Sequence, residues 1–247
     1  MSIFSRQMPR RNSSLRKRRM NNKEGDPVKR ATKWLQEAEA QDGYLAKCRK
    51  DASNSSARRA CSYTVWPDQG LAEKLASRGY ASKIIIMHPS CEGGMPHTRP
   101  GGVICLPAYF PDEKLERTMR HEHIHIWQRD AAEEWETLCQ RDGWRKIPAS
   151  VAESEIPLQW LERCRLNPDT VQSRWWAWQG TYIPLPLFTR TDKPDLHDIV
   201  IRWYDRISGR VLTSPPTSYT RRYGSVGPAM MEHPFEWAAY QMEKPSL

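Results

Sequence analysis

The chain has 247 residues, which is enough for one domain with a sizeable hydrophobic core. Hydrophobic residues make up 38% of it, and 11 Trp, 9 Tyr and 4 Phe supply apolar area, which excludes a chain that is disordered throughout. The formal net charge is +9, and the six cysteines form no C-x-x-C pair, which excludes a zinc ribbon and a dithiol redox motif.

The basic charge is concentrated in the first 30 residues. This segment holds ten Lys or Arg and two acidic residues, a net of +8, whereas residues 31–247 hold 28 basic and 27 acidic side chains, a net of +1. With almost nothing apolar to bury, residues 1–30 are predicted to form a disordered basic arm. The run Arg16, Lys17, Arg18 and Arg19 is a candidate nucleic-acid-binding segment or nuclear address, and the alternative is a solubilising tail without a specific partner.

The N-terminal charges are followed by no apolar region of the kind found in signal peptides. No stretch approaches the roughly 18 consecutive apolar residues of a membrane span. Together with the unpaired cysteines, this favours a reduced intracellular protein, either cytoplasmic or nuclear, or one packaged in a virion. No membrane partner is expected.

Residues 31–247 are predicted to form one α+β domain. Helices are expected at residues 31–47 and around 71–76, and strands at 83–87 and 103–106. The strand at 103–106 is also a candidate edge on which an extended peptide could pair, although it reads equally well as an ordinary strand of the sheet. Two strands leading into a helix place that helix beside a small sheet.

The longest predicted helix spans residues 112–129. It contains good helix formers and no internal Gly or Pro, and its apolar residues share one broad face. Residues 131–140 are expected to continue as a helix after a bend, and Gly143 ends it.

The periodicity changes after Asn167-Pro168-Asp169. A hairpin is predicted over residues 175–188 around Gln179-Gly180, and a second one over 199–204 and 211–213. Residues 172–213 are therefore expected to be a β-rich insertion that covers or borders the cleft of the site. A final helix is predicted from Pro234 to about Met242, with proline in its favoured first turn.

The most specific signal is the H-E-x-x-H motif formed by His121, Glu122 and His125 near the end of the long helix. Residues four apart share one helical face, so both imidazoles can reach a single zinc ion. Glu122 is then placed to act as the general base rather than as a ligand. A β-strand would instead point His121, His123 and His125 to one side, but the flanking pattern is helical, and His123 is expected to pack with Met119 and Trp127.

The third ligand distinguishes the classes of zinc hydrolase. A metzincin would need Gly and His at positions 128 and 131, where this chain has Gln128 and Ala131, so that class is excluded. Glu236 in the first turn of the final helix is the preferred third ligand, although an acidic residue there also complements the helix dipole. The other candidates are Glu153, Asp169, His197, Glu232 and His233, with Cys91 and Cys105 as less favoured thiolates.

The motif and its flanks, from Met119 to Arg129, together with the later Pro-x-Glu-x-x-Ala helix at 234–239, resemble gluzincin-type zinc metallopeptidases. Uncharacterised domains of large DNA viruses are included in this resemblance. It covers about residues 103–129 and 231–240, and it implies a zincin-like fold in which two His and one Glu hold Zn²⁺ and the motif glutamate is the base. The chain departs from the pattern in the long separation of His125 and Glu236, and in Tyr240, where some members have an acidic residue.

The predicted activity is therefore hydrolysis of a peptide or protein substrate by a zinc-activated water, with Glu122 as the base. Tyr219, Tyr223 and Tyr240 are candidates to stabilise the oxyanion. One alternative is a catalytically inactive structural or nucleic-acid-associated protein, with a zinc-stabilised fold and a phosphate-binding arm. Another is a hydrolase of non-peptide amides, which the sequence does not distinguish from a peptidase.

Overall fold

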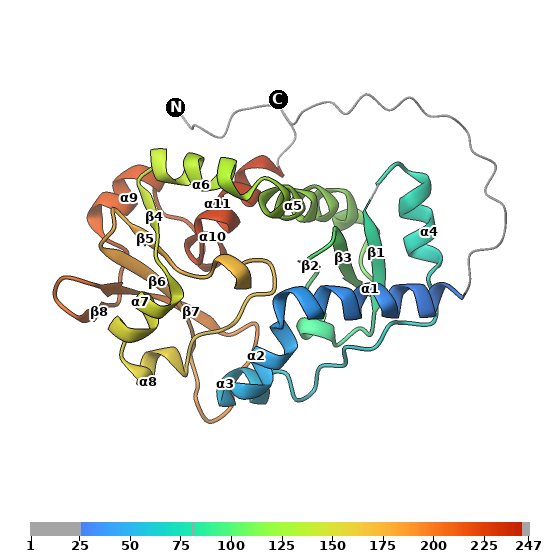
Figure 1. Cartoon of the computed structure of the whole chain (residues 1–247), viewed down its shortest axis with the longest axis horizontal. Helices are drawn as coiled ribbons and strands as arrows, with labels where there is room; N and C mark the ends of the chain where they lie inside the picture. Colours follow the sequence, from blue (N-terminus) through green and yellow to red (C-terminus); the bar gives the residue numbers. More distant parts are fainter. Residues whose placement is uncertain (1–25, 81, 244–247) are drawn as a thin grey trace.

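The computed structural model describes residues 26–80 and 82–243 as an α+β protein with two separate sheets (Figure 1). The α-helices of the described residues are α1 (Pro27–Asp42), α2 (Tyr44–Lys50), α3 (Ala52–Ala57), α4 (Gly70–Ser77), α5 (Asp112–Asp130), α6 (Ala132–Arg141), α7 (Ala149–Glu155), α8 (Leu158–Leu161), α9 (Thr217–Tyr223), α10 (Pro228–Met231) and α11 (Pro234–Met242). The Arg16–Arg19 run and most of the predicted arm lie outside the described residues.

The N-terminal helix differs from the prediction at both ends. It begins at Pro27, inside the segment assigned to the arm, and Asp26 caps it by accepting from the N–H of Val28. It ends at Gly43, which adopts a left-handed conformation with φ of 57°, and α2 continues beyond it. The expected single helix over 31–47 is therefore two helices, because the left-handed glycine breaks the helical hydrogen bonding.

The first sheet has three strands in the order β1 (Lys83–Met87), β3 (Val103–Pro107) and β2 (His97–Arg99). β1 is parallel to β3, and β2 is antiparallel to it. The two predicted strands are confirmed, whereas β2 was not predicted. The hypothesis that 103–106 offers an edge to a peptide is wrong, because β3 is paired on both sides.

Helix α5 confirms the prediction for 112–129 and lies between the two halves of the molecule (Figure 1). Leu115 and Met119 pack with the first sheet and α4, while Ile124 packs into the aromatic core of the second half. Both sides of the helix are therefore fixed by tertiary packing, and its motif residues project between the two cores.

The second sheet has five strands, namely β4 (Trp144–Lys146), β5 (Trp176–Trp178), β6 (Tyr182–Phe188), β7 (Ile199–Asp205) and β8 (Arg210–Leu212), each antiparallel to the next. Both predicted hairpins are confirmed. Gln179 and Gly180 have φ of 51° and 71°, the positive values that a tight hairpin turn requires. The sheet begins at β4, before residue 172, so 172–213 is not a self-contained insertion.

Aromatic residues join the second sheet to the helices around it. Trp135, Trp176 and Trp203 are fully buried in one cluster with Tyr219 of α9 and Phe235 of α11. Through this cluster α11, which confirms the predicted final helix, is held against α5. The position of Glu236 relative to the motif therefore depends on apolar packing of the second half.

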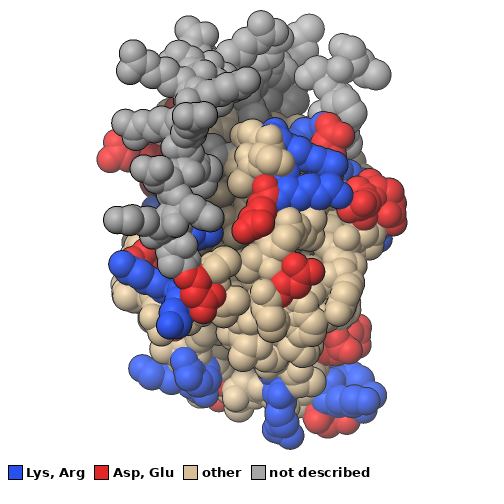
Figure 2. Space-filling model, turned by 90° about the vertical axis from the view of Figure 1, so that its right-hand side faces the viewer, with Lys and Arg blue, Asp and Glu red and all other residues tan. Residues whose placement is uncertain are grey.

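Within the described residues, none of the helices is long and apolar enough to cross a membrane. Figure 2 shows the face beside α4 and the start of α1, where Lys and Arg side chains are interspersed with Asp and Glu. This mixture agrees with the near-zero net charge of the sequence after residue 30.

Candidate metal centre

The structure brings His121, His125 and Glu236 together, as the sequence predicted. The Nε2 atoms of the two histidines lie 3.1 Å apart, and Oε2 of Glu236 lies 3.6 Å from each of them. His121 and His125 come from α5, and Glu236 comes from the first turn of α11, more than a hundred residues later. Within the described residues these three form the candidate metal-ligand group.

The separations fit a zinc ion. Two ligand atoms that are each about 2.0–2.1 Å from a tetrahedral ion lie about 3.3 Å from one another. The three measured separations, 3.1, 3.6 and 3.6 Å, surround this value. An ion at their centre would need only small movements of the side chains.

The hydrogen bonds behind the two imidazoles fix where their lone pairs point. Nδ1 of His121 lies 2.9 Å from Oε2 of Glu243, and Nδ1 of His125 lies 2.7 Å from Oε1 of Gln128. Both partners are acceptors, since Gln128 uses its NH₂ group to donate to the Phe235 carbonyl at 3.0 Å. Each neutral imidazole therefore carries its proton on Nδ1 and turns the Nε2 lone pair toward the other ligands, the arrangement found in metal-bound histidines.

Glu236 is oriented by a residue that was not predicted. Nδ2 of Asn167 donates to Oε1 of Glu236 at 2.8 Å, which leaves Oε2 toward the histidines. Glu243 and Gln128 were missed as well. No local sequence signal marks Glu243 or Asn167, because they reach the site only through tertiary folding. Gln128 is one helical turn after His125 and was recognisable from that spacing.

The electrostatics of the centre favour a bound cation. Burial lowers the pKa of His121, but the hydrogen bonds to Glu236 and Glu243 outweigh burial and raise this pKa to about 11. Burial raises the pKa of Glu236, but the two histidines outweigh burial and hold it well below its usual range. Three lone pairs that converge on one buried point require positive charge there, which either a proton or a metal ion can supply.

Glu122 lies beside the three ligands and does not belong to them. Its side chain is 4% exposed, and Oε2 has no hydrogen-bond partner among the described residues. Burial, reinforced by the negative charge of Asp169, raises the pKa of Glu122 to about 8. A buried carboxylate with an unsatisfied oxygen next to a candidate metal position is suited to accept a proton from a water molecule.

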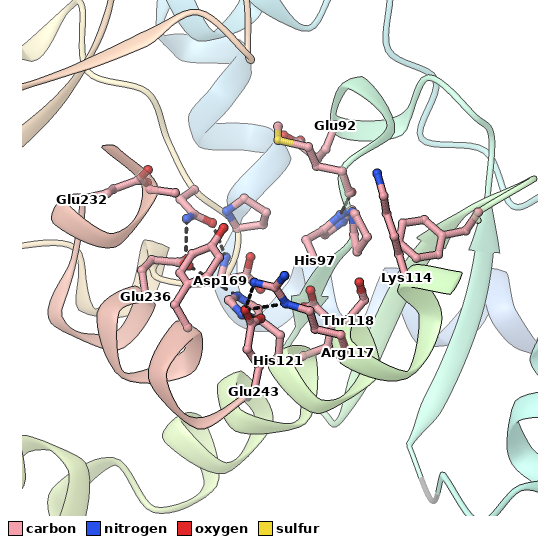
Figure 3. Close-up of a pocket in the computed structure, with 18 of the residues that line it drawn as sticks. Glu92, His97, Lys114, Arg117, Thr118, His121, Asp169, Glu232, Glu236 and Glu243 are labelled. Carbon is pink, nitrogen blue, oxygen red and sulfur yellow. Dashed lines mark hydrogen bonds and ion pairs between the residues drawn. The ribbon is translucent and has the colours of Figure 1, made fainter. Parts of the chain in front are cut away.

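A pocket of about 450 Å³ opens onto this centre. His121, Glu122 and Glu236 line one side of it, and the labelled His97 and Asp169 lie around the same pocket (Figure 3). None of residues 172–213, all of which are described, lines it, so the expectation that this segment borders the cleft is wrong. The segments around Arg165–Asp169 and Ala229–Glu243 line it instead.

None of the other candidate ligands joins the three-residue group. His197 contacts the Gly93 carbonyl, His233 caps α11, Glu153 accepts from Trp175 and Glu232 pairs with Arg165. Asp169 lines the pocket but accepts from Thr98. Cys91 and Cys105 are buried in the core behind the first sheet.

Of the remaining predicted residues, which are His123 and the three candidate tyrosines, one tyrosine lies at the candidate centre. His123 points away from the centre and contacts Oγ of Ser82 and the Met119 carbonyl, while the predicted packing partner Trp127 belongs to the aromatic cluster. Tyr219 is buried in that cluster, and Tyr223 packs against it. Tyr240 alone of the three tyrosines lines the pocket, with its ring centroid 4.7 Å from that of His121.

Comparisons of the chain with protein-family models, with curated proteins and with solved structures found no match.

Proposed function

We propose that this protein is a zinc-dependent metallopeptidase in which His121, His125 and Glu236 hold Zn²⁺ and Glu122 is the general base. The observation that carries the proposal is the convergence of three candidate ligand atoms at 3.1–3.6 Å beside a buried carboxylate oxygen that has no partner among the described residues. Two imidazoles and one carboxylate, with room for a fourth ligand, are the donor set of catalytic zinc sites.

The ion would polarise the scissile carbonyl and lower the pKa of a water molecule at the centre. The protein's own part follows from the geometry. Glu122 accepts the proton of that water and returns it to the leaving amine. Asn167 and Gln128 hold the ligands in orientation, while Tyr240 is the tyrosine placed to donate to a developing oxyanion.

Metal analysis and turnover test the proposal together. Purified protein is expected to hold one zinc ion per chain, and His125→Ala is expected to lose it. His123→Ala is the matched control, since it removes a histidine of the same helix that contacts Ser82 and not the centre, and it is expected to keep the metal. Glu122→Gln is expected to keep the metal and lose hydrolysis, because it removes the base and no ligand. Full activity of Glu122→Gln, or full zinc occupancy of His125→Ala, would contradict the assignment.

The alternative is an inactive, nucleic-acid-associated protein that binds through its basic N-terminal arm. The candidate binding residues of the arm, Arg16 to Arg19, lie outside the described residues. It predicts salt-sensitive binding of nucleic acid that is lost when residues 1–25 are removed, with no hydrolysis by zinc-loaded protein. The metallopeptidase proposal predicts hydrolysis by the truncated chain. The two are therefore distinguished by one pair of measurements on the same protein.

A further inference from the structure

The outer edge of β2 is occupied by the protein's own chain. β2 pairs with β3 on one side only, and the N–H and C=O of Thr98 point to the opposite side. There the N–H donates to Oδ1 of Asp169 at 2.6 Å, and the C=O accepts from Nη2 of Arg129 at 3.2 Å. Both backbone groups with which an added strand would pair are therefore already used.

The neighbouring positions on this edge offer no N–H group either. Pro96 and Pro100 flank β2 at its two ends. Proline has no N–H to donate. Arg129 also donates to the carbonyls of Pro168 and Asp169, both at 2.9 Å, which lays this segment along the edge. An extended peptide would have to displace this segment in order to pair along β2.

The pocket wall beside this edge holds two acceptor atoms that receive no hydrogen bond from the described residues, Oδ2 of Asp169 and Nε2 of His97. Asp169 is half-buried and forms no ion pair with any Lys or Arg in residues 26–80 and 82–243, although Thr98 donates to its Oδ1. His97 is 2% exposed, its Nδ1 lies 3.2 Å from the Met95 carbonyl, and its Nε2 has no partner among the described residues. Because a carbonyl only accepts, the proton is on Nδ1, and Nε2 presents a lone pair.

The cations of the pocket are already matched or lie at its rim. Arg117 pairs with Glu243, and Arg165 pairs with Glu232. Arg129 lies buried beside Asp169, but its N–H groups are used by the side chain and carbonyl of Thr98 and by the carbonyls of Pro168 and Asp169. Lys114 is exposed. Among the described residues, the pocket atoms left without a donor are Oδ2 of Asp169 and Nε2 of His97, and they suit a ligand that brings positive charge and several N–H donors. A primary ammonium group has both properties.

Resting on the proposed metallopeptidase function, we infer that the substrate is a peptide with a free amino terminus, whose ammonium group is bound by Asp169 and His97. A compact pocket of about 450 Å³ is roughly 10 Å across, so a terminus held at these residues leaves its first peptide bond within reach of the centre. The enzyme then removes residues from the amino end and does not cut internal bonds.

Hydrolysis of a matched pair of peptide libraries tests the inference. One library has free amino termini, and the other is the same library after N-acetylation. Zinc-loaded full-length protein is expected to shorten the free library from its amino end, at a rate at least about tenfold above that for the acetylated library. Equal cleavage of the acetylated library, or cleavage at internal bonds, would overturn the inference while leaving the peptidase proposal intact.

If neither library is cleaved, the peptidase proposal fails. A binding measurement then tests the recognition of the amino terminus separately from hydrolysis. Calorimetry on Glu122→Gln uses alanyl-alanine amide and its N-acetyl derivative as probes. The free amine is expected to bind at least about tenfold more tightly, and Asp169→Asn, which retains an acceptor for Thr98, is expected to remove the difference. Thr98→Val is the matched control, because it loses a contact to the same carboxylate but keeps its charge, and it should preserve the difference. Equal affinities for the two probes would overturn the inference.

Discussion

Oε2 of Glu243 lies 2.9 Å from Nδ1 of His121, on the imidazole nitrogen opposite the one that faces His125. The carboxylate is 3% exposed and also accepts from Arg117 of α5, which holds it in place. Glu243 follows α11 directly, so this contact ties the end of the final helix to the motif. It fixes the tautomer of His121 and would strengthen the imidazole as a ligand of the proposed metal ion.

Replacing Glu243 by Ala is predicted to weaken zinc binding by about 10- to 100-fold without removing a ligand, because His121 loses the acceptor that orients it. Competition with a chromophoric chelator measures the change. The control is Glu116→Ala, since Glu116 is exposed and pairs on the surface with Arg120. An unchanged zinc affinity of Glu243→Ala would show that the contact does not support the site.

Removal of the metal is predicted to lower the melting temperature of the protein. The ion would join α5 to α11, and a ligand that binds only the folded state adds about 4 kcal/mol when its free concentration is 1,000 times Kd. Thermal unfolding with and without a chelator checks this in His125→Ala and in His123→Ala. The first variant should show no shift on chelation, and the second should show the full shift. A chelator shift that survives in His125→Ala would place the metal elsewhere.

The sequence was a good guide where the signal is local. The spacing of His121 and His125 within one helix, the turn at Gln179-Gly180 and the proline that opens α11 each depend on neighbouring residues, and the structure has all three. Glu236 was chosen as the partner of the motif because gluzincins, which the motif resembles, take their third ligand from a glutamate on a later helix, and the structure places its carboxylate beside both imidazoles.

The features that sequence reasoning missed depend on contacts between distant segments. β2 and β4 are three residues long, and each exists because a neighbouring strand pairs with it. Asn167 reaches Glu236 across 69 positions of the chain. The helix over 31–47 was misjudged for another reason, because Gly43 stands in good helical surroundings and only its left-handed backbone ends α1.

A buried ion pair next to the pocket leads to a prediction about stability. Nε of Arg58 lies 2.9 Å from Oε1 of Glu92, both side chains are at most 5% exposed, and Arg58 also donates to the Leu166 carbonyl at 2.6 Å. Arg58→Ala would leave Glu92 as an uncompensated buried charge and is predicted to destabilise the protein by about 3–5 kcal/mol. Urea unfolding measures the loss. Arg59→Ala changes an exposed arginine at the next position and should have little effect. A similarly small effect of Arg58→Ala would mean that Glu92 finds other partners.

His233 gives a prediction about pH because both its nitrogens are committed in the neutral form. Nδ1 accepts from the N–H of Phe235 at 3.1 Å and so caps α11, while Nε2 donates to the carbonyl of Ser173 at 2.6 Å. Protonation of Nδ1 would remove the acceptor that caps the helix. Burial accordingly lowers the pKa of His233 from 6.5 to about 4.

The unfolded chain therefore binds a proton at His233 between pH 6.5 and about 4 that the folded chain does not bind, so this residue makes folding less stable as the pH falls through that window. A pKa shift of this size corresponds to a loss of about 3 kcal/mol in the free energy of unfolding. The loss begins as the pH falls below 6.5 and is complete below about pH 4. His233→Asn keeps a good N-cap acceptor without a titrating group.

Urea unfolding of the parent protein and of His233→Asn is measured at several pH values. The difference between their free energies of unfolding isolates the contribution of His233 from that of the acidic residues. The variant should be less stable than the parent at pH 7, where it lacks the bond to Ser173, and should approach or exceed it near pH 4. A constant difference across this range would show that His233 does not change its protonation between the folded and unfolded states.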